Sequence, residues 1–343
     1  MGERLIRQLG LRPGDEIDGS VRTGGKGRGP SLEKVTSVLG RAPDTLGERP
    51  DFNRLPAIHP NERLRLEADG AAGGGQADYT NRVIDLLCPL GKGQRALIVA
   101  PAKAGKTMVL QSIAQGVSAN YPSADLFILL VDERPEEVFE MEAAGVGEVI
   151  ASSFDNPAQR HVALAELTLE RARRRVEPGD DVVLIVDSLT RLARAYNTVE
   201  KGSGRTLSGG LDAQSMERPK RFLGSARRID PGHGGGSLTI IATALVDTGS
   251  RMDQVIFEEF KGTGNSELVL SRELAERRVF PAIDLVASAT RREELLLDPE
   301  TLAASHVLRQ RLAGMTPINA MTDLLTDLRR NKTNGELIKT LAA

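Results

Sequence analysis

The chain of 343 residues contains a single cysteine, Cys88, and therefore cannot form an internal disulfide. One cysteine is typical of a reducing compartment such as the cytoplasm. Cys88 follows the largely apolar stretch 83–87, which favours a buried structural thiol over a reactive nucleophile. The length suggests two domains, or one large domain with a small appendage.

Strong net charge and long apolar runs are also missing. Because the formal net charge is −2, any nucleic-acid-binding site must be a local cluster or a lined channel. The four histidines stand far apart in the sequence, so no zinc site is expected. No apolar run is long enough to span a membrane, and the charged N-terminus lacks a signal-peptide core. We expect a soluble, cytoplasmic protein.

Apolar stretches that are typical of buried strands alternate with helical patterns through most of the chain. The strand-like stretches are 95–100, 126–131, 148–152, 182–186 and 238–245. The longest helical segment between them, 161–175, carries Val162, Leu164, Leu167 and Leu169 on roughly one face. This alternation predicts an α/β fold with a mostly parallel sheet that is covered on both sides.

Composition divides the chain into three parts. Residues 1–66 contain a short predicted helix over 3–9 and basic, glycine-rich extended segments around 22–30. Residues 67–79 have the composition of a flexible linker. Residues 80–343 form the predicted α/β domain.

A phosphate-binding motif follows the first predicted strand of that domain. The segment 101–107, PAKAGKT, runs directly into a helical pattern. Gly105 allows backbone N–H groups to converge on a phosphate, at the positive end of the following helix. Lys106 supplies a charge to the outer phosphates, and the Thr107 hydroxyl can bind Mg²⁺. The strict motif begins with glycine where this chain has Ala100, so the match is to a relaxed form.

Two carboxylates follow other predicted strands. Asp187 ends the stretch 182–186, at the sheet edge where it can face the same Mg²⁺. Its alternative role is to cap the helix that begins at Ser188. Glu133 follows the stretch 126–131 and is the candidate that orients the attacking water. The alternative for Glu133 is a solvated surface residue.

Longer strings resemble, in the same order, the Rho family of transcription termination factors. They are PAKAGKTM, LLVDERPEEV, VDSLTRLARAYNTV, RPKRFLGSAR, IIATALVDTGSRMD, EEFKGTGN, ERRVFPAID and TRREELL. The resemblance is dense over about 80–335 and thinner over 3–66, through LRPGDEIDG and LPAIHPNERLRLE. It implies a RecA-like P-loop NTPase core, a homohexameric ring, ATP with Mg²⁺ between neighbouring subunits, and single-stranded RNA in the ring centre. The implied activity is that of an RNA-dependent ATPase and helicase that releases nascent RNA from RNA polymerase.

The resemblance also assigns individual residues. The nucleotide contacts are Gly91, Lys92, Gly93, Gln94, Arg95, Ala96, Lys103, Ala104, Gly105, Lys106, Thr107, Met108, Arg134 and Phe280. Arg291 matches the arginine that a neighbouring subunit inserts at the phosphates, and Arg278 matches a second interfacial arginine. A guanidinium against the transition-state charge is worth about 10³–10⁵ in rate.

RNA contacts are implied for two loops and one lysine. The first loop, 202–214, carries Arg205, the second, 248–253, carries Arg251, and Lys220 lies in the string RPKRFLGSAR. The family commonly has lysine at both loop positions, so charge is kept while hydrogen-bonding geometry differs. A glycine-rich stretch, 231–236, lengthens the family pattern and has no assigned function.

The front of the chain departs from the family pattern. Rho has a complete OB-type domain with aromatic platforms, and each stacked base contributes about 1–3 kcal/mol. This chain begins late in that domain, with Gly29 and Pro30 where the family has an aromatic pair, and Phe52 is the only aromatic in 1–66. We expect the primary RNA site to be absent or weakened, with Lys26 and Arg28 forming a modest electrostatic contact or simply a solvated basic loop.

Three functions fit these observations. The first is a termination factor, and the second is an RNA-binding regulatory ATPase that no longer terminates. The third, a rotary-type ATPase subunit, is disfavoured because two basic, glycine-bearing loops suit a nucleic-acid channel. Comparing RNA-stimulated ATP hydrolysis with termination on a defined template separates the first two.

Overall fold

A computed structural model of the chain describes residues 2–22, 31–45, 49–68, 78–200, 209–212 and 214–342. Within these residues the central element is a nine-stranded sheet. Its parallel strands are, in spatial order, β12 (Ser266–Val269), β6 (Arg95–Pro101), β11 (Ser237–Val246), β9 (Asp181–Asp187), β7 (Asp125–Glu133) and β8 (Glu148–Ser153). The remaining strands are antiparallel: β13 (Ala289–Thr290) beside β12, and β10 (Arg227–Ile229) between β11 and β3 (Ala57–Ile58). The predicted α/β fold and its predicted strands are confirmed.

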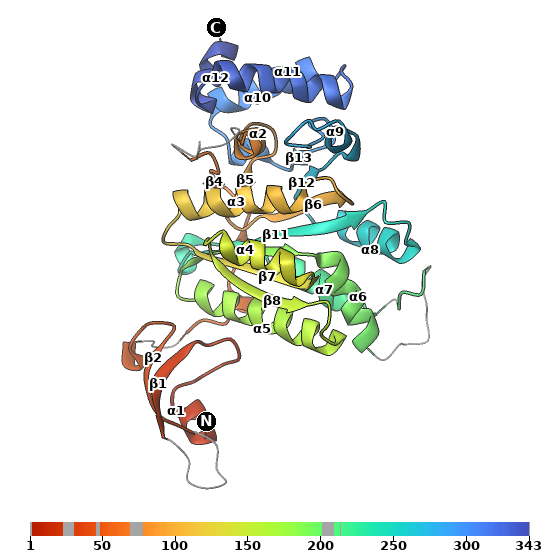
Figure 1. Cartoon of the computed structure of the whole chain (residues 1–343). Helices are drawn as coiled ribbons and strands as arrows, with labels where there is room; N and C mark the ends of the chain where they lie inside the picture. Colours follow the sequence, from red (N-terminus) through yellow and green to blue (C-terminus); the bar gives the residue numbers. More distant parts are fainter. Residues whose placement is uncertain are drawn as a thin grey trace.

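Helices cover both faces of the sheet (Figure 1). The helices on one face are α2 (Thr80–Leu87), α3 (Lys106–Asn120), α4 (Pro135–Ala143), α9 (Arg272–Glu276), α10 (Pro299–Leu312), α11 (Pro317–Arg330) and α12 (Asn334–Ala342). Those on the other face are α5 (Ala158–Val176), α6 (Leu189–Val199), α7 (Glu217–Leu223) and α8 (Arg251–Lys261). An apolar core lies between the sheet and each of these two groups of helices. Along β6, Ile98 packs in the core on the α3 side, and Leu97 packs in the core on the α5 side. Both faces of a strand are therefore apolar, as in parallel sheets generally.

One detail of the predicted α5 is wrong. Leu167 is 51% exposed and lies off the buried face. The residues of α5 that pack in the core are instead Val162, Ala165, Leu169, Ala172 and Val176. They follow the alternating spacing of three and four residues that one helix face requires. The alanines in this set allow α5 to approach the sheet without large side chains.

The N-terminal residues form a small unit against α5 (Figure 1). Helix α1 (Glu3–Gln8) packs with an antiparallel pair, β1 (Ile17–Arg22) and β2 (Ser31–Val38). Glu177, at the end of α5, accepts a hydrogen bond from the Phe52 amide at 3.0 Å and pairs with Arg12 and with Arg174. Some positions discussed in the sequence analysis lie outside the described residues: most of the predicted linker, Lys26, Arg28, Gly29, Pro30 and Arg205.

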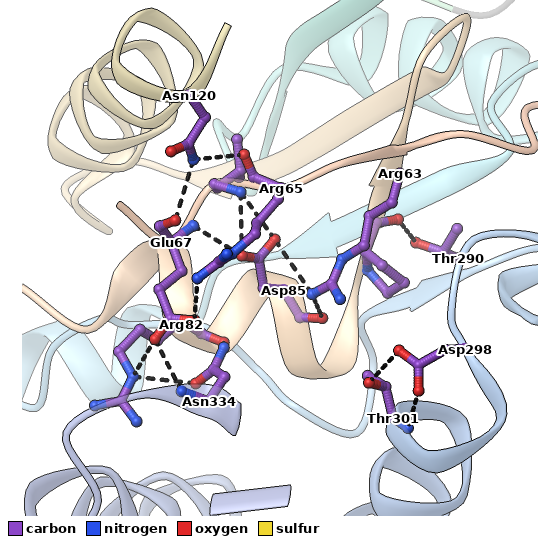
Figure 2. A network of polar contacts seen from close by, with 12 residues as sticks. Arg63, Arg65, Glu67, Arg82, Asp85, Asn120, Thr290, Asp298, Thr301 and Asn334 are labelled. Atoms are coloured by element: carbon purple, nitrogen blue, oxygen red, sulfur yellow. Dashed lines mark hydrogen bonds and ion pairs between the residues drawn. The ribbon is translucent and has the colours of Figure 1, made fainter. Parts of the chain in front are cut away.

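The segment that leads from this unit into the body is held by a buried polar network (Figure 2). Asp85 of α2 accepts hydrogen bonds from the amides of Leu66 and Glu67, at 3.1 and 2.8 Å. Burial raises the pKa of Asp85 to about 6, although the nearby Arg63 opposes the shift. Glu67 accepts the amide of Asn334 at 2.9 Å. The connecting segment is thus joined to both α2 and α12, and its β4 (Arg63–Leu64) pairs with β5 (Leu90–Gly91).

Two residues singled out in the sequence are buried. Cys88 lies in the core with a pKa raised by burial, which confirms a structural thiol. Phe52 is fully buried, with the guanidinium groups of Arg173 and Arg227 over its ring at 5.5 and 4.7 Å. The Phe52 ring is therefore inaccessible to a stacking base. In the described part of the chain, no helix is long and apolar enough to cross a membrane.

Candidate active site

The predicted phosphate loop connects the end of β6 to the start of α3. Gly105 has φ +85°, a value that favours glycine, and α3 begins at the next residue, Lys106. The first N–H groups of α3 have no helical partner and point toward the loop. This is the arrangement that binds a phosphate at a helix N-terminus.

The side chain of Lys106 lies between the two predicted carboxylates. Its Nζ is 2.6 Å from Oδ1 of Asp187 and 3.1 Å from Oε1 of Glu133. Burial alone would lower the pKa of Lys106, but the charges of Asp187 and Glu133 outweigh it and the pKa is raised. The structure thus brings together three predicted catalytic residues from three separate elements.

Glu133 is not a solvated surface residue, because only 1% of it is exposed. Burial, followed by the charge of Asp187, raises its pKa to about 8. Its Oε2 has no hydrogen-bond partner among the described residues, although Arg191 lies 3.5 Å away as an ion-pair partner. A buried carboxylate oxygen without a donor is suited to accept a hydrogen bond from a water molecule.

Asp187 does not cap the following helix. The cap of α6 is Ser188, whose Oγ accepts the Arg191 amide at 3.2 Å. Asp187 instead accepts a hydrogen bond from the Thr243 hydroxyl at 2.7 Å. The Asp187 carboxylate and the Thr107 hydroxyl offer the oxygen ligands that Mg²⁺ prefers, so these residues fit the predicted metal.

A cavity of about 700 Å³ lies beside the phosphate loop. Its lining includes Gly105 and Met108 on one side and the segment from Arg278 to Ala282 on the other. Phe280 projects here, 37% exposed and with its ring 3.6 Å from the position a Cβ of Gly105 would occupy. The size and the aromatic wall suit a nucleotide base. Arg278 therefore lies beside the phosphate loop of its own chain. Arg134, directly after Glu133, is exposed.

The predicted nucleotide segment 91–96 lies elsewhere. It enters β6 at Arg95, whereas the phosphate loop leaves β6 at Pro101, about 20 Å away at the usual rise of a strand. Lys92 pairs with Glu62 and with Asp181, and the Arg95 guanidinium donates to main-chain carbonyls. Segment 91–96 and the phosphate loop of one chain therefore lie at opposite ends of β6.

Arg291 lies at that same distant edge. It follows β13, whose Thr290 pairs with Ser266 of β12 opposite Ala96 of β6. Its side chain is exposed. Arg291 and Lys106 of one chain are thus at opposite ends of the sheet.

The second loop predicted to bind RNA leaves the sheet beside the phosphate loop. Val246 at the end of β11 lies opposite Pro101 in the strand ladder. Arg251 begins α8 and lines two adjacent cavities of about 630 and 510 Å³. Gly209, which belongs to the first loop, packs against the backbone of Met252. The described parts of the two predicted RNA loops therefore lie side by side.

Lys220 is not part of this arrangement. It pairs with Glu259, which lies eight positions after Arg251 along α8, or about 12 Å at the helical rise. The structure thus places Lys220 at the far end of α8 from Arg251.

Sequence reasoning missed two contacts of the catalytic group. Arg191 pairs with Glu133, and Thr243 donates to Asp187. Arg191 stands one helical turn after Asp187 in the string VDSLTRLARAYNTV, which is the signal that could have indicated it. Thr243 is separated from Asp187 by 56 positions, so only the sheet order reveals it.

The raised pKa of Glu133 predicts a pH dependence. Because the base acts in its deprotonated form, we expect kcat/KM for ATP to rise as the pH increases through about 8. The positive charge of Arg191 lowers the pKa of Glu133, so Arg191→Gln should move this rise to higher pH. A profile that is flat between pH 7 and 9 in the wild type would contradict the role of Glu133.

The comparisons with known proteins agree with this geometry. Residues 80–290 match the nucleotide-binding domain of the ATP synthase alpha/beta family. An ATPase from the type III secretion system of pathogenic bacteria superposes with a TM-score of 0.68 at 24% identity, covering 93% of this chain and 92% of that one. The fold and the phosphate site therefore define a P-loop ATPase with a RecA-like core.

Full-length similarity is more specific. The chain is 56% identical over 98% of its length to the transcription termination factor Rho of Gemmatimonas aurantiaca, and covers 46% of that protein. It is 53% identical to the factor of Haemophilus influenzae, covering 98% of this chain and 79% of that protein. The chain belongs to the transcription termination factor Rho family. It spans less than half of the Gemmatimonas protein.

Proposed function

We propose that this chain is an ATP-dependent RNA translocase and helicase that facilitates transcription termination by releasing nascent RNA from RNA polymerase. The observation that carries the proposal is that the catalytic group and the RNA loops share one sheet edge. Strand β11 supports both, because Thr243 bonds Asp187 and the loop that contains Arg251 begins just after Val246. ATP hydrolysis and RNA binding can therefore both affect the position of β11.

In the proposed reaction each group has a distinct task. Lys106 and the N-terminus of α3 hold the outer phosphates, and Glu133 orients the attacking water and accepts its proton. Mg²⁺, held by Thr107 and Asp187, would neutralise charge that develops on the phosphates. Phe280 and Met108 would pack against the adenine base of ATP.

The active site of the proposal is completed by a neighbouring subunit. Arg291 cannot reach Lys106 of its own chain, because the two lie at opposite ends of the sheet. In a closed ring, the edge that carries Arg291 faces the nucleotide edge of the next copy. We therefore propose a homohexamer with ATP between subunits, and segment 91–96 belongs to the same trans side.

Contacts within one subunit can transmit the nucleotide state to RNA. Lys106 bonds Asp187, which bonds Thr243 on β11. Two residues further along, the Leu245 amide donates to Oγ1 of Thr190 on α6 at 2.9 Å. A change in the position of Lys106 can therefore shift both β11 and α6, which carry the two RNA loops.

RNA affinity should depend on these loops and on backbone charge. We expect Arg251→Ala to remove most of the RNA stimulation of ATP hydrolysis while nucleotide binding is kept. Binding should weaken with salt at a log–log slope of about −0.7 per neutralised phosphate, with little preference between oligocytidylate and oligoadenylate. The measurement is RNA binding against salt, together with ATPase activity, for wild type and variant.

Lys261→Ala is the matched control, since Lys261 is exposed at the other end of α8. It should leave RNA stimulation intact, and so should Arg28→Ala. Pyrimidine-selective binding that survives Arg251→Ala and is lost in Arg28→Ala would place the RNA site in the N-terminal region and overturn this part of the proposal.

A second candidate, an RNA-binding regulatory ATPase that no longer terminates, is favoured by the burial of Phe52. That residue is the only aromatic in 1–66 and cannot serve as a stacking platform. We propose that residues 1–66 contain part of an OB-type RNA-binding region and its connector, and that this region contacts the motor domain through Glu177.

A further inference from the structure

The main chain of Arg291 is held by Asn265. The Arg291 amide donates to the Asn265 carbonyl at 2.9 Å. Asn265 directly precedes β12, which pairs with both β6 and β13. The direction in which Arg291 leaves the sheet edge therefore depends on how Asn265 is fixed.

Gln94 fixes Asn265 from within the core. Its Nε2 donates to the Asn265 carbonyl at 3.1 Å and to Asn265 Oδ1 at 2.9 Å. Only 1% of Gln94 is exposed, and its main-chain carbonyl accepts the Ile240 amide at 2.9 Å. Gln94 is thus joined by its main chain to β11, and by its side chain to the carbonyl that accepts the Arg291 amide.

Arg95 acts on Arg291 from the same side. Its amide donates to Asn265 Oδ1 at 2.8 Å, and its guanidinium donates to the carbonyls of Thr263 and Ala226. Burial first, and then the charge of Arg291, lower the pKa of Arg95. The two carbonyls leave the positive charge of the Arg95 guanidinium unneutralised. Repulsion between the guanidinium groups of Arg95 and Arg291 disfavours a conformation in which Arg291 folds back on its own chain.

We infer that Gln94 and Asn265 are positioning residues for Arg291. Through the shared Asn265 carbonyl they hold the main chain of Arg291, so that its guanidinium projects from the sheet edge toward the nucleotide of the neighbouring subunit. The inference rests on the proposed role of Arg291 in trans. Segment 91–96 would then affect catalysis through the position of Arg291, without touching ATP itself.

Gln94→Met tests this inference, because methionine keeps the length of the side chain and removes both donated hydrogen bonds. We expect kcat for RNA-stimulated ATP hydrolysis in assembled rings to fall by about 10²-fold, the cost of a small misplacement of a catalytic group. KM for ATP and the affinity for ADP should be unchanged. Binding of ADP with fluoroaluminate, which resembles the transition state, should weaken.

Thr239→Val is the matched control. Thr239 is buried, and its Oγ1 accepts the Gly93 amide at 2.8 Å, so this variant also loses one buried hydrogen bond to the same segment. It should lower Tm but leave kcat unchanged. A structural role alone for Gln94 would give the two variants the same behaviour.

A double variant separates positioning from other effects. Because Gln94 acts through Arg291, Gln94→Met combined with Arg291→Ala should be no slower than Arg291→Ala alone. A further loss in the double variant, or wild-type kcat in Gln94→Met, would overturn the inference. If Gln94→Met does not assemble, Asn265→Ala removes the Oδ1 that accepts from Gln94 Nε2 and from the Arg95 amide, and it must show the same non-additivity.

Failure of the underlying function gives a different result. Wild-type kcat in Arg291→Ala itself would overturn the trans role of Arg291 and the positioning inference together. An inactive Arg291→Ala beside a fully active Gln94→Met would overturn the positioning inference only.

Discussion

Lys106→Ala should abolish ATP turnover while the ring still assembles. The Nζ of Lys106 lies within 3.1 Å of both Glu133 and Asp187, where charge grows on the phosphates in the transition state. Loss of one such preorganised donor typically costs about 10²–10³ in kcat, and a full positive charge costs more. Steady-state ATP hydrolysis, with assembly checked by native mass, measures the effect.

Lys339→Ala is a suitable control, since it removes an exposed lysine of α12. It should hydrolyse ATP at the wild-type rate. Wild-type turnover in assembled Lys106→Ala would show that this loop is not the site of hydrolysis.

Mixing two inactive variants should restore part of the activity. Arg291→Ala subunits keep Glu133, and Glu133→Gln subunits keep Arg291. If the active site is shared, rings mixed in equal amounts contain an intact pair at roughly one interface in four. The reason is geometric, because Arg291 and Lys106 of one chain lie at opposite ends of the sheet.

The measurement is ATP hydrolysis as a function of the mixing ratio. Each variant alone should be strongly impaired, since an arginine at the transition state is worth about 10³–10⁵ in rate. Inactivity at every ratio, in rings whose mixed composition is confirmed by mass, would mean that the two residues do not meet across an interface.

The parts of this site that the sequence predicts are local. The phosphate loop is readable because a strand, a glycine-containing loop and a helix follow one another within residues 95–120. Asp187 and Glu133 can be identified because Asp187 directly follows an apolar stretch and Glu133 stands two residues after another. Parallel strands place those ends at one edge of the sheet, so the meeting of these residues with Lys106 could be expected.

The parts that the sequence does not predict depend on which strands are neighbours. The contact of Thr243 with Asp187 requires β11 to lie beside β9. The contact of Gln94 with Asn265 joins residues 171 positions apart, through the pairing of β6 with β12. Strand order is not encoded in the period of apolar residues, so neither contact could be predicted.

Because strand order and packing are not encoded in the sequence pattern, the sequence also did not show that segment 91–96 lies far from the phosphate loop, or that Lys220 lies far from Arg251. Segment 91–96 and the phosphate loop are close in sequence, but an extended strand carries them to opposite edges. Lys220 is one of several basic residues in its string, and only the structure reveals its pairing with Glu259 of α8. Leu167 fails for a related reason, since apolar character alone did not indicate which face of α5 is buried.

The central claim is that ATP hydrolysis at the shared site drives RNA out of a transcription complex. Its most direct test is release of labelled transcript from RNA polymerase stalled on a defined template, with ATP hydrolysis followed in the same reaction. We predict release that requires ATP and is lost in Lys106→Ala and in Arg251→Ala. RNA-stimulated hydrolysis at the wild-type rate without any release of transcript would contradict the claim and identify the chain as a regulatory ATPase.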